Sequence, residues 1–305
     1  MSDAAASSLP PPDSLPRPVP MVDGLAPGVV GNWLDWATGE LAGHSDSARA
    51  DAEILLAALL GSERARLRLH HDDAIEAATV LRYAAWIERR KGGEPVAYIV
   101  GLQGFWTLDL VVDTAVLIPR PDTETLVEWA LALVPAGVPQ RLLDLGTGSG
   151  AIALALASER PACELLATDV SEAALAVAGD NARRLEMASI CFRHGAWWDA
   201  VPAEAAPFDL IVSNPPYIAE GDAHLAALRY EPRLALTAGA DGLDALRVIS
   251  GGAAAHLRPG GWLLLEHGHD QGPQVQALLA AAGFTAIESR RDFGGNVRVT
   301  GGRRP

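Results

Sequence analysis

The sequence predicts an α/β fold with a largely parallel sheet, preceded by a small helical domain. After residue 140, short apolar segments typical of strands alternate with helical segments, a pattern that favours a sheet with helices on both faces. Between residues 31 and 92, by contrast, apolar side chains recur at helical spacing only. A chain of 305 residues is long enough for two such domains.

The segment 29–92 predicts a bundle of helices. Ser45 and Asp46 are candidate N-caps for a helix that ends at Gly61. A second helix begins after Asp72 or Asp73 and ends in the basic run 89–91, which suits the negative end of the helix dipole.

Residues 93–122 predict a β-hairpin that links the two domains. Apolar side chains alternate over 96–100 and again over 105–112, as they do in strands with one buried face. Gln103-Gly104 lies between these runs and is the expected turn.

Residues 123–305 are expected to form the α/β domain. Its strands are predicted at 141–145, 164–168, 208–213, 261–267, 285–289 and 296–300. Its helices are predicted at 123–133, 151–158, 172–185, 243–256 and 274–282.

Composition narrows the function classes. The formal net charge is −14, which argues against a nucleic-acid partner because such proteins usually carry a basic surface. Two cysteines cannot build a disulfide framework, and no apolar run is long enough to span a membrane. Residues 1–28 are rich in Pro, Ala and Ser, lack the pattern of a secretory signal and predict a disordered tail. We therefore expect a cytoplasmic protein with no DNA or membrane partner, and a monomer.

The first motif that points to chemistry is Asp144-Leu145-Gly146-Thr147-Gly148-Ser149-Gly150, between a strand and a helix. Glycines allow the backbone to approach a ligand, and the helix N-terminus offers free N–H groups. Asp169 ends the next strand, where a carboxylate can accept both ribose hydroxyls of a nucleoside. The loop also fits the dinucleotide fingerprint, so NAD stays open at this point, although Gly150 and Asp144 look more like S-adenosylmethionine-dependent methyltransferases.

The second motif is Asn214-Pro215-Pro216-Tyr217, directly after a predicted strand. It resembles the signature of methyltransferases that act on planar amides or exocyclic amines. The nitrogen of an amide is a poor nucleophile, and acceptors aimed at its N–H groups can orient its lone pair and stabilise developing positive charge. The Asn214 oxygen and the Pro215 carbonyl can be these acceptors, and the Tyr217 ring can pack on the planar group.

With the rest of the chain, these motifs resemble the HemK/PrmC family, the protein-(glutamine-N5) methyltransferases that modify peptide-chain release factors. The resemblance runs from about Ala48 to Arg303. Besides the two motifs, it rests on the runs Arg49–Leu56, Gly93-Glu94-Pro95, Phe105-Trp106, Leu117-Ile118-Pro119-Arg120-Pro121-Asp122-Thr123-Glu124, Leu265-Glu266-His267-Gly268 and Arg291-Asp292-Phe293-Gly294.

The resemblance implies a Rossmann-like class I methyltransferase domain with seven strands, and a helical domain that recognises the release factor. The methyl acceptor would be the glutamine of the factor's Gly-Gly-Gln motif. Residues 146–150 and Asp169 would bind S-adenosylmethionine, with Trp197 beside the adenine. Asn214, also near the cofactor, and residues 215–217 would hold the glutamine. The family often has an acidic residue before this tryptophan, whereas this chain has Gly195-Ala196, and both Trp197 and Trp198 are candidates for the adenine pocket.

Several alternatives stay open. A glutamine methyltransferase of a ribosomal protein shares the second motif, although the run 119–124 favours the release-factor branch. An N6-adenine methyltransferase has an overlapping signature but must bind the phosphates of a nucleic acid, which the net negative charge of the chain disfavours. A non-catalytic release-factor binder would not need both motifs intact. Glu266, His267, His269 and Asp270 invite a metal site, but their spacing supplies no further ligand pair, and we expect no metal.

Overall fold

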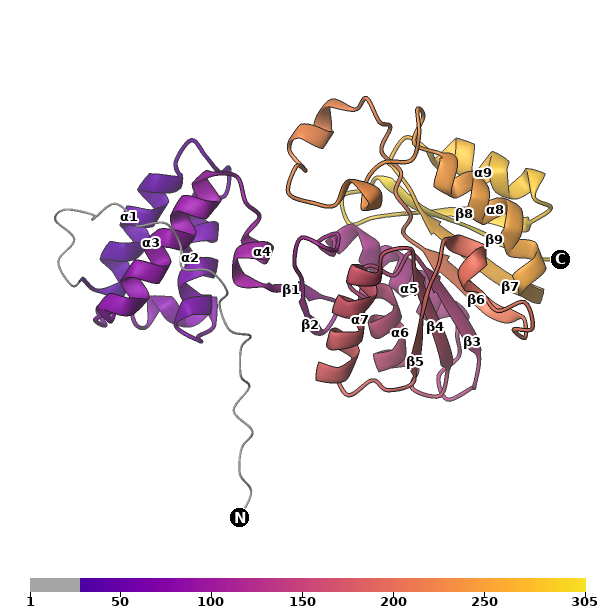
Figure 1. Ribbon diagram of the computed structural model, residues 1–305, viewed down its shortest axis with the longest axis horizontal. Helices are drawn as coiled ribbons and strands as arrows, with labels where there is room; N and C mark the ends of the chain where they lie inside the picture. The colour runs from indigo at the N-terminus through magenta and orange to yellow at the C-terminus, as the bar shows by residue number, and fades with distance from the viewer. Residues whose placement is uncertain (1–27) are drawn as a thin grey trace, which may run out of the picture. The chain divides into compact units, whose positions relative to one another are not determined.

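The computed structural model describes residues 28–305, and these residues form two compact units divided between Ile99 and Val100 (Figure 1). The disordered tail predicted for residues 1–28 lies, apart from Gly28, outside the described residues. Across residues 28–305, no helix is both long enough and apolar enough to cross a membrane.

The first unit is helical, as its apolar spacing predicted. Its helices are α1 (Val30–Leu41), α2 (Ala48–Leu59), the short 3₁₀ helix η1 (Arg64–Arg68), α3 (Ala77–Lys91) and α4 (Val96–Val100). The side chains of Trp33, Leu55 and Tyr83 are fully buried between α1, α2 and α3. The Tyr83 hydroxyl donates a 2.8 Å hydrogen bond to the Ala52 carbonyl, so this buried phenol is satisfied inside the bundle.

The start of α2 differs slightly from the predicted cap. The helix begins at Ala48 and its N-cap is Ser47, rather than Ser45 or Asp46. The hydroxyls of Ser45 and Ser47 both donate to the Asp51 carboxylate, at 2.7 and 2.9 Å. Arg90 donates to the same carboxylate at 2.7 Å, which fixes the end of α3 against the start of α2.

The hairpin that follows is shorter than predicted. Residues 96–100, predicted as a strand from their alternation, form the helix α4, so that prediction is wrong. The hairpin consists of β1 (Leu102–Phe105) and β2 (Leu108–Val111), and Gln103-Gly104 lies inside β1 instead of at the turn. The chain turns at Trp106, whose φ is 57° and whose N–H donates to Glu124 at 2.9 Å.

The second unit contains the predicted sheet, with seven strands in the order β5-β4-β3-β6-β7-β9-β8. Their bounds are β3 (Arg141–Leu145), β4 (Glu164–Asp169), β5 (Ile190–His194), β6 (Phe208–Ser213), β7 (Leu257–Glu266), β8 (Thr285–Arg291) and β9 (Val297–Arg303). Strand β5 is the one that the sequence pattern did not predict. β3 to β7 are parallel, and β9 runs antiparallel between β7 and β8.

Helices connect these strands. The α-helices are α5 (Glu124–Leu133), α6 (Ala151–Glu159), α7 (Glu172–Arg184), α8 (Asp244–His256) and α9 (Gly272–Ala281). Short 3₁₀ helices lie at η2 (Pro121–Thr123), η3 (Trp197–Ala200), η4 (Ala223–Ala226) and η5 (Arg233–Ala235).

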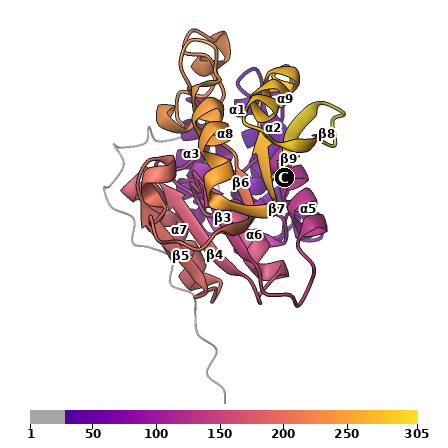
Figure 2. The same cartoon turned by 90° about the vertical axis from the view of Figure 1, so that its right-hand side faces the viewer.

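Successive side chains of a strand point to opposite faces of the sheet, so these mostly apolar strands contribute to a hydrophobic core on each face. Leu142 of β3 points into a cluster with α5 and α6, whereas Leu143 points into a cluster with α8 and α9. The two helical layers can be followed on either side of the strands in Figures 1 and 2.

The strand order places a ligand crevice at the centre of the sheet. From β3 the chain proceeds outward to β4 and β5, then returns to the other side of β3 with β6 and β7. In open α/β sheets, ligands bind where the strand order reverses, outside the carboxyl ends of the strands. The loops after β3, β4 and β6 therefore meet at this point.

Candidate active site

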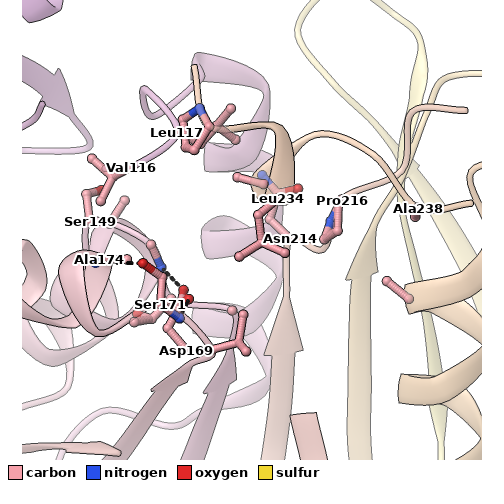
Figure 3. A pocket seen from close by; sticks show the side chains of 18 of the residues that line it. Val116, Leu117, Ser149, Asp169, Ser171, Ala174, Asn214, Pro216, Leu234 and Ala238 are labelled. Atoms are coloured by element: carbon pink, nitrogen blue, oxygen red, sulfur yellow. Dashed lines mark hydrogen bonds between the residues drawn. The ribbon is translucent and has the colours of Figure 1, made fainter. Parts of the chain in front are cut away.

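A cavity of about 470 Å³ lies at the carboxyl ends of these strands, within the range of small-molecule sites. Among the predicted site residues, it is lined by Gly146, Thr147, Gly148, Ser149, Asp169, Trp197, Asn214 and Pro216. Gly150, Pro215 and Tyr217 are not among the lining residues. Figure 3 shows Asp169 and Ser171 on one wall of the cavity, with Asn214 and Pro216 across from them.

The glycine loop turns from β3 into α6 through left-handed backbone. Gly146 and Gly150 have φ values of 73° and 84°, where a side chain would be strained. At Gly150 a Cβ atom would also come within 3.3 Å of the Ala178 Cβ atom, so this glycine allows α6 to start close to α7. Gly150 thus packs against α7 and does not line the cavity, whereas residues 146–149 do.

Asp169 is the acid at the end of β4. One carboxylate oxygen accepts the Gly148 N–H at 2.9 Å, and the other accepts the Ser171 N–H at 2.8 Å. Burial raises the pKa of this carboxyl, and the backbone N–H groups oppose that shift. Each carboxylate oxygen has a second lone pair, so Asp169 can hold the loop and still accept two ligand hydroxyls.

The structure separates the two adjacent tryptophans. Trp197 lines the cavity, and its ring edge lies 3.4 Å from where a Cβ atom of Gly146 would be. The Trp198 ring instead stacks on His256 at 4.6 Å between centroids, and its Nε1 donates to the Val248 carbonyl at 3.0 Å. Only Trp197 is therefore placed to cover a planar group above the glycine loop.

Asn214 directly follows β6, as the sequence predicted. Its side-chain nitrogen donates to the Thr123 hydroxyl at 3.2 Å, which leaves the carboxamide oxygen as the atom free to accept. Pro215 is buried. Tyr217 is also packed behind the wall, with its hydroxyl 3.5 Å from the Glu266 carboxylate, and burial raises the pKa of that hydroxyl.

The remaining wall comes from segments whose role the sequence patterns did not reveal. The cavity is also lined by residues between 115 and 123 and by residues between 232 and 248. The two segments are tied together because the Arg120 guanidinium pairs with Glu231, whose other oxygen accepts the Ile118 N–H at 3.2 Å. Arg120 belongs to the run noted above, but nothing in the local sequence identifies Glu231 as its partner.

The acidic and histidine side chains of residues 266–270, at the end of β7, do not form a metal site. Glu266 and His267 are buried, and the His267 ring contacts the Thr300 hydroxyl at 2.7 Å and the Gly268 carbonyl at 2.8 Å. Within residues 28–305, no group of three or more His, Cys, Asp or Glu side chains could hold a metal ion.

Asp144, at the end of β3, makes stability depend on pH. Its carboxyl is fully buried, and burial raises its pKa to about 7, with the charge of Asp169 adding to the shift and a 2.7 Å hydrogen bond from Thr147 opposing it. Because the folded-state pKa lies above the unfolded value, the stabilisation is present at low pH and is lost as pH rises through about 7.

We therefore expect the free energy of unfolding of the parent to fall relative to that of Asp144→Asn between about pH 4 and about pH 7. A shift from 3.8 to about 7 corresponds to up to about 4 kcal/mol. Urea unfolding of both proteins at several pH values measures this difference. A difference that does not vary with pH would contradict the expectation.

Comparisons with known proteins agree with this geometry. Residues 32–101 match the model of the PrmC N-terminal domain, and residues 124–230 match the methyltransferase small domain. The chain is 53% identical to a release factor glutamine methyltransferase of Xylella fastidiosa, over 84% of this chain and 94% of that protein. It is 51% identical to one from Pseudomonas aeruginosa, over 85% of this chain and 94% of that protein.

A solved structure shows the same fold at lower similarity. The 16S rRNA N2 G1207 methyltransferase of T. thermophilus, in complex with AdoMet and guanosine, has 23% identity and a TM-score of 0.50, over 67% of this chain and 50% of that one. The predicted class I methyltransferase fold is confirmed by this likeness and by the seven-stranded sheet. The high identity to relatives of nearly the same length decides the family: the chain belongs to the release factor glutamine methyltransferases.

Proposed function

We propose that this protein transfers the methyl group of S-adenosylmethionine to the side-chain nitrogen of the glutamine in the Gly-Gly-Gln motif of peptide-chain release factors. The observation that carries the proposal is Asn214, whose carboxamide nitrogen is held by Thr123 while its oxygen is left free on the wall of the cavity. The glycine loop and Asp169 line the same cavity, so one site can hold both the methyl donor and the acceptor.

The residues present fit S-adenosylmethionine. Residues 146–149 offer close backbone approach, Asp169 offers acceptors for the ribose hydroxyls, and Trp197 covers a planar base. When bound, this cofactor supplies an electrophilic methyl carbon on a sulfonium. The apolar side chains that line most of the cavity, among them Val116, Leu117 and Ile152, limit the access of water to that carbon.

The chain's own residues then act on the acceptor amide. Held by residues 146–149 and Asp169, S-adenosylmethionine would supply the methyl group and leave as the thioether, and the acceptor nitrogen would release one proton to solvent. The Asn214 oxygen and the Pro215 carbonyl are the proposed acceptors for the two N–H groups, which orient the lone pair and stabilise the charge that develops on nitrogen. Pro216 lines the cavity beside them, and Tyr217 supports this wall from behind.

The helical unit is the proposed recognition element for the factor, because it lies outside the α/β unit that carries every residue of the cavity. A protein that begins at Gly93 should bind the cofactor like the parent but lose at least about tenfold in kcat/KM for intact release factor, since remote contacts supply binding energy. Calorimetry and methyl-transfer kinetics measure the two quantities, and thermal unfolding checks that the shortened protein folds. Parental kinetics of a folded shortened protein would contradict this role.

Because release factors act in translation, we also propose the cytoplasm as the compartment.

The transfer itself is tested with labelled S-adenosylmethionine and a purified release factor, followed by peptide mass mapping. We expect one methyl group on the glutamine of the Gly-Gly-Gln peptide, and none when that glutamine is replaced by asparagine. Parallel incubations contain ribosomal proteins or DNA in place of the factor. Label there, with an unmodified release factor, would refute the proposal in favour of one of the alternatives.

A further inference from the structure

Trp197 packs over the glycine loop from a strained backbone. Its φ is 47°, in the left-handed region that residues with a side chain rarely adopt. Such a conformation persists only where the surrounding structure holds it. The ring edge of Trp197 lies 3.4 Å from the position of a Gly146 Cβ atom, so a shift of this residue would change the wall of the cavity. What holds Trp197 in place therefore determines part of the shape of the cavity.

Backbone hydrogen bonds hold the chain just before and just after Trp197. The Gly195 N–H donates to the Asp169 carbonyl at 3.0 Å, which ties the start of this segment to the end of β4. The Asp199 N–H donates to the Ala196 carbonyl at 2.9 Å, which closes the turn of η3. Neither bond connects η3 with α8, whose first residues also line the cavity.

The side chain of Trp198 makes that connection. Its Nε1 atom donates to the Val248 carbonyl at 3.0 Å, and its ring stacks on the His256 ring with an angle of 4° between the two planes. Val248, Gly252 and His256 are four residues apart along α8 and so lie on one face of the helix. The indole of Trp198 thus lies along this face, and its hydrogen-bond partner Val248 itself lines the cavity.

Gly252 makes room for the indole. A Cβ atom at this position would come 2.2 Å from Nε1 and 2.5 Å from Cδ1 of Trp198, far inside contact distance. Glycine destabilises a helix interior relative to alanine, so a glycine here needs a reason, and the contact with Trp198 supplies it. The neighbouring Gly251 is exposed, and apart from its own stretch of helix no atom of residues 28–305 would lie within 4 Å of its Cβ atom. The need for a missing side chain is therefore specific to position 252.

We propose that Trp198 is a positioning residue that holds Trp197 over the glycine loop, and that Gly252 is the position in α8 that admits its ring. This inference rests on the proposed function, in which Trp197 covers the adenine of S-adenosylmethionine. Trp198 does not line the cavity, so its effect on the cofactor passes through Trp197 and the backbone of η3. The expected consequence of losing this anchor is weaker cofactor binding, with the methyl-transfer step unchanged.

A pair of glycine variants tests the proposal. Gly252→Ala displaces the indole but favours the helix, whereas Gly251→Ala gives the same gain in helix propensity and displaces no side chain. Titration calorimetry of the full-length proteins measures the dissociation constant of S-adenosylmethionine. We expect Gly252→Ala to weaken binding by about 5- to 50-fold, since the stacking of a base on an aromatic ring contributes affinity of this order. Gly251→Ala should bind like the parent. Parental affinity of Gly252→Ala, or equal losses in the two variants, would overturn the proposal.

A double-mutant cycle separates this role from a purely structural one. Trp198→Ala removes the anchor, and Trp197→Ala removes the group that is positioned. Trp198→Ala should weaken cofactor binding about as much as Gly252→Ala does, and it should cause no further loss in the Trp197→Ala background. The same loss in both backgrounds would mean that Trp198 acts on the cavity without Trp197, which contradicts the proposal. Thermal unfolding reports folding, and if Trp198→Ala does not fold, the two glycine variants decide the matter.

Methyl-transfer kinetics with full-length release factor add a second readout. The loss in Gly252→Ala should appear as a raised KM for the cofactor with a parental kcat, because the contact is made equally before and during transfer. A lowered kcat with a parental KM would contradict the proposal. If the parent and Trp197→Ala differ in cofactor affinity while Gly252→Ala and Trp198→Ala bind like the parent, only the present inference fails. If Trp197→Ala binds like the parent, the proposed place of the adenine is wrong and the inference fails with it.

Discussion

Replacing Asn214 with alanine is expected to slow methyl transfer by about 10²- to 10³-fold, as does the loss of one preorganised acceptor or donor at a reacting centre in other enzymes. The carboxamide oxygen is free on the cavity wall because its nitrogen is held by Thr123. Its value rises as positive charge develops on the glutamine nitrogen, so the loss should fall on the chemical step. Single-turnover transfer with saturating cofactor and release factor measures that step.

Two further variants sharpen this expectation. Asn214→Asp keeps an acceptor of the same shape but removes the N–H₂ group that donates to Thr123, so its rate should lie between those of the parent and Asn214→Ala. Asn296→Ala, an exposed asparagine in the turn between β8 and β9, is the matched control and should keep the parental rate. If Asn214→Ala transferred the methyl group as fast as the parent, the proposed role of this motif would be wrong.

Asp169→Ala is expected to weaken binding of S-adenosylmethionine by about 10²-fold or more, since each charge-assisted hydrogen bond to a ribose hydroxyl contributes about 1.5–3 kcal/mol. The loss has a second cause in the protein. The Gly148 and Ser171 N–H groups both donate to this carboxylate, so the glycine loop and the start of α7 lose a shared anchor. Titration calorimetry measures the dissociation constant.

The matched control for this change is Asp199→Ala. Asp199 lies in η3 next to the two tryptophans but is exposed and does not line the cavity, so its removal should leave cofactor affinity unchanged. Asp169→Asn keeps one acceptor oxygen and should bind more tightly than Asp169→Ala. Equal cofactor affinity of the parent and Asp169→Ala would rule out ribose binding by this residue.

Most of the fold could be predicted because strands buried on both faces are mostly apolar, as in β3 and β6, where Asp144 and Asp209 interrupt the apolar residues. Strand β5 escaped prediction because it is an edge strand, in which only Ile190 is buried and the next four residues are not. The segment 96–100 was misread because five apolar residues fit strand and helix spacing equally well. Only its packing as α4 decides between them.

The site was predictable where it follows from the sheet. The carboxyl ends of neighbouring parallel strands meet, so the glycine loop, Asp169 and Asn214 had to lie close together once the strand order was fixed. The opposite wall was not predictable, because Arg120 and Glu231 are 111 residues apart in the chain. No local sequence pattern around either residue identifies the other as its partner. The place of Tyr217 behind the wall likewise depends on packing against Glu266.

The antiparallel position of β9 has a consequence for the order in which the protein assembles. β8 precedes β9 in the chain but pairs only with β9, so it has no place in the sheet until residues 297–303 have inserted beside β7. β3, β4 and β6, which carry the glycine loop, Asp169 and Asn214, can pair before that. Arg298, the positive charge that acts on Glu266, arrives only with β9. During synthesis, the strands that carry the glycine loop, Asp169 and Asn214 can thus pair before β9, and Arg298 with it, takes its place in the sheet.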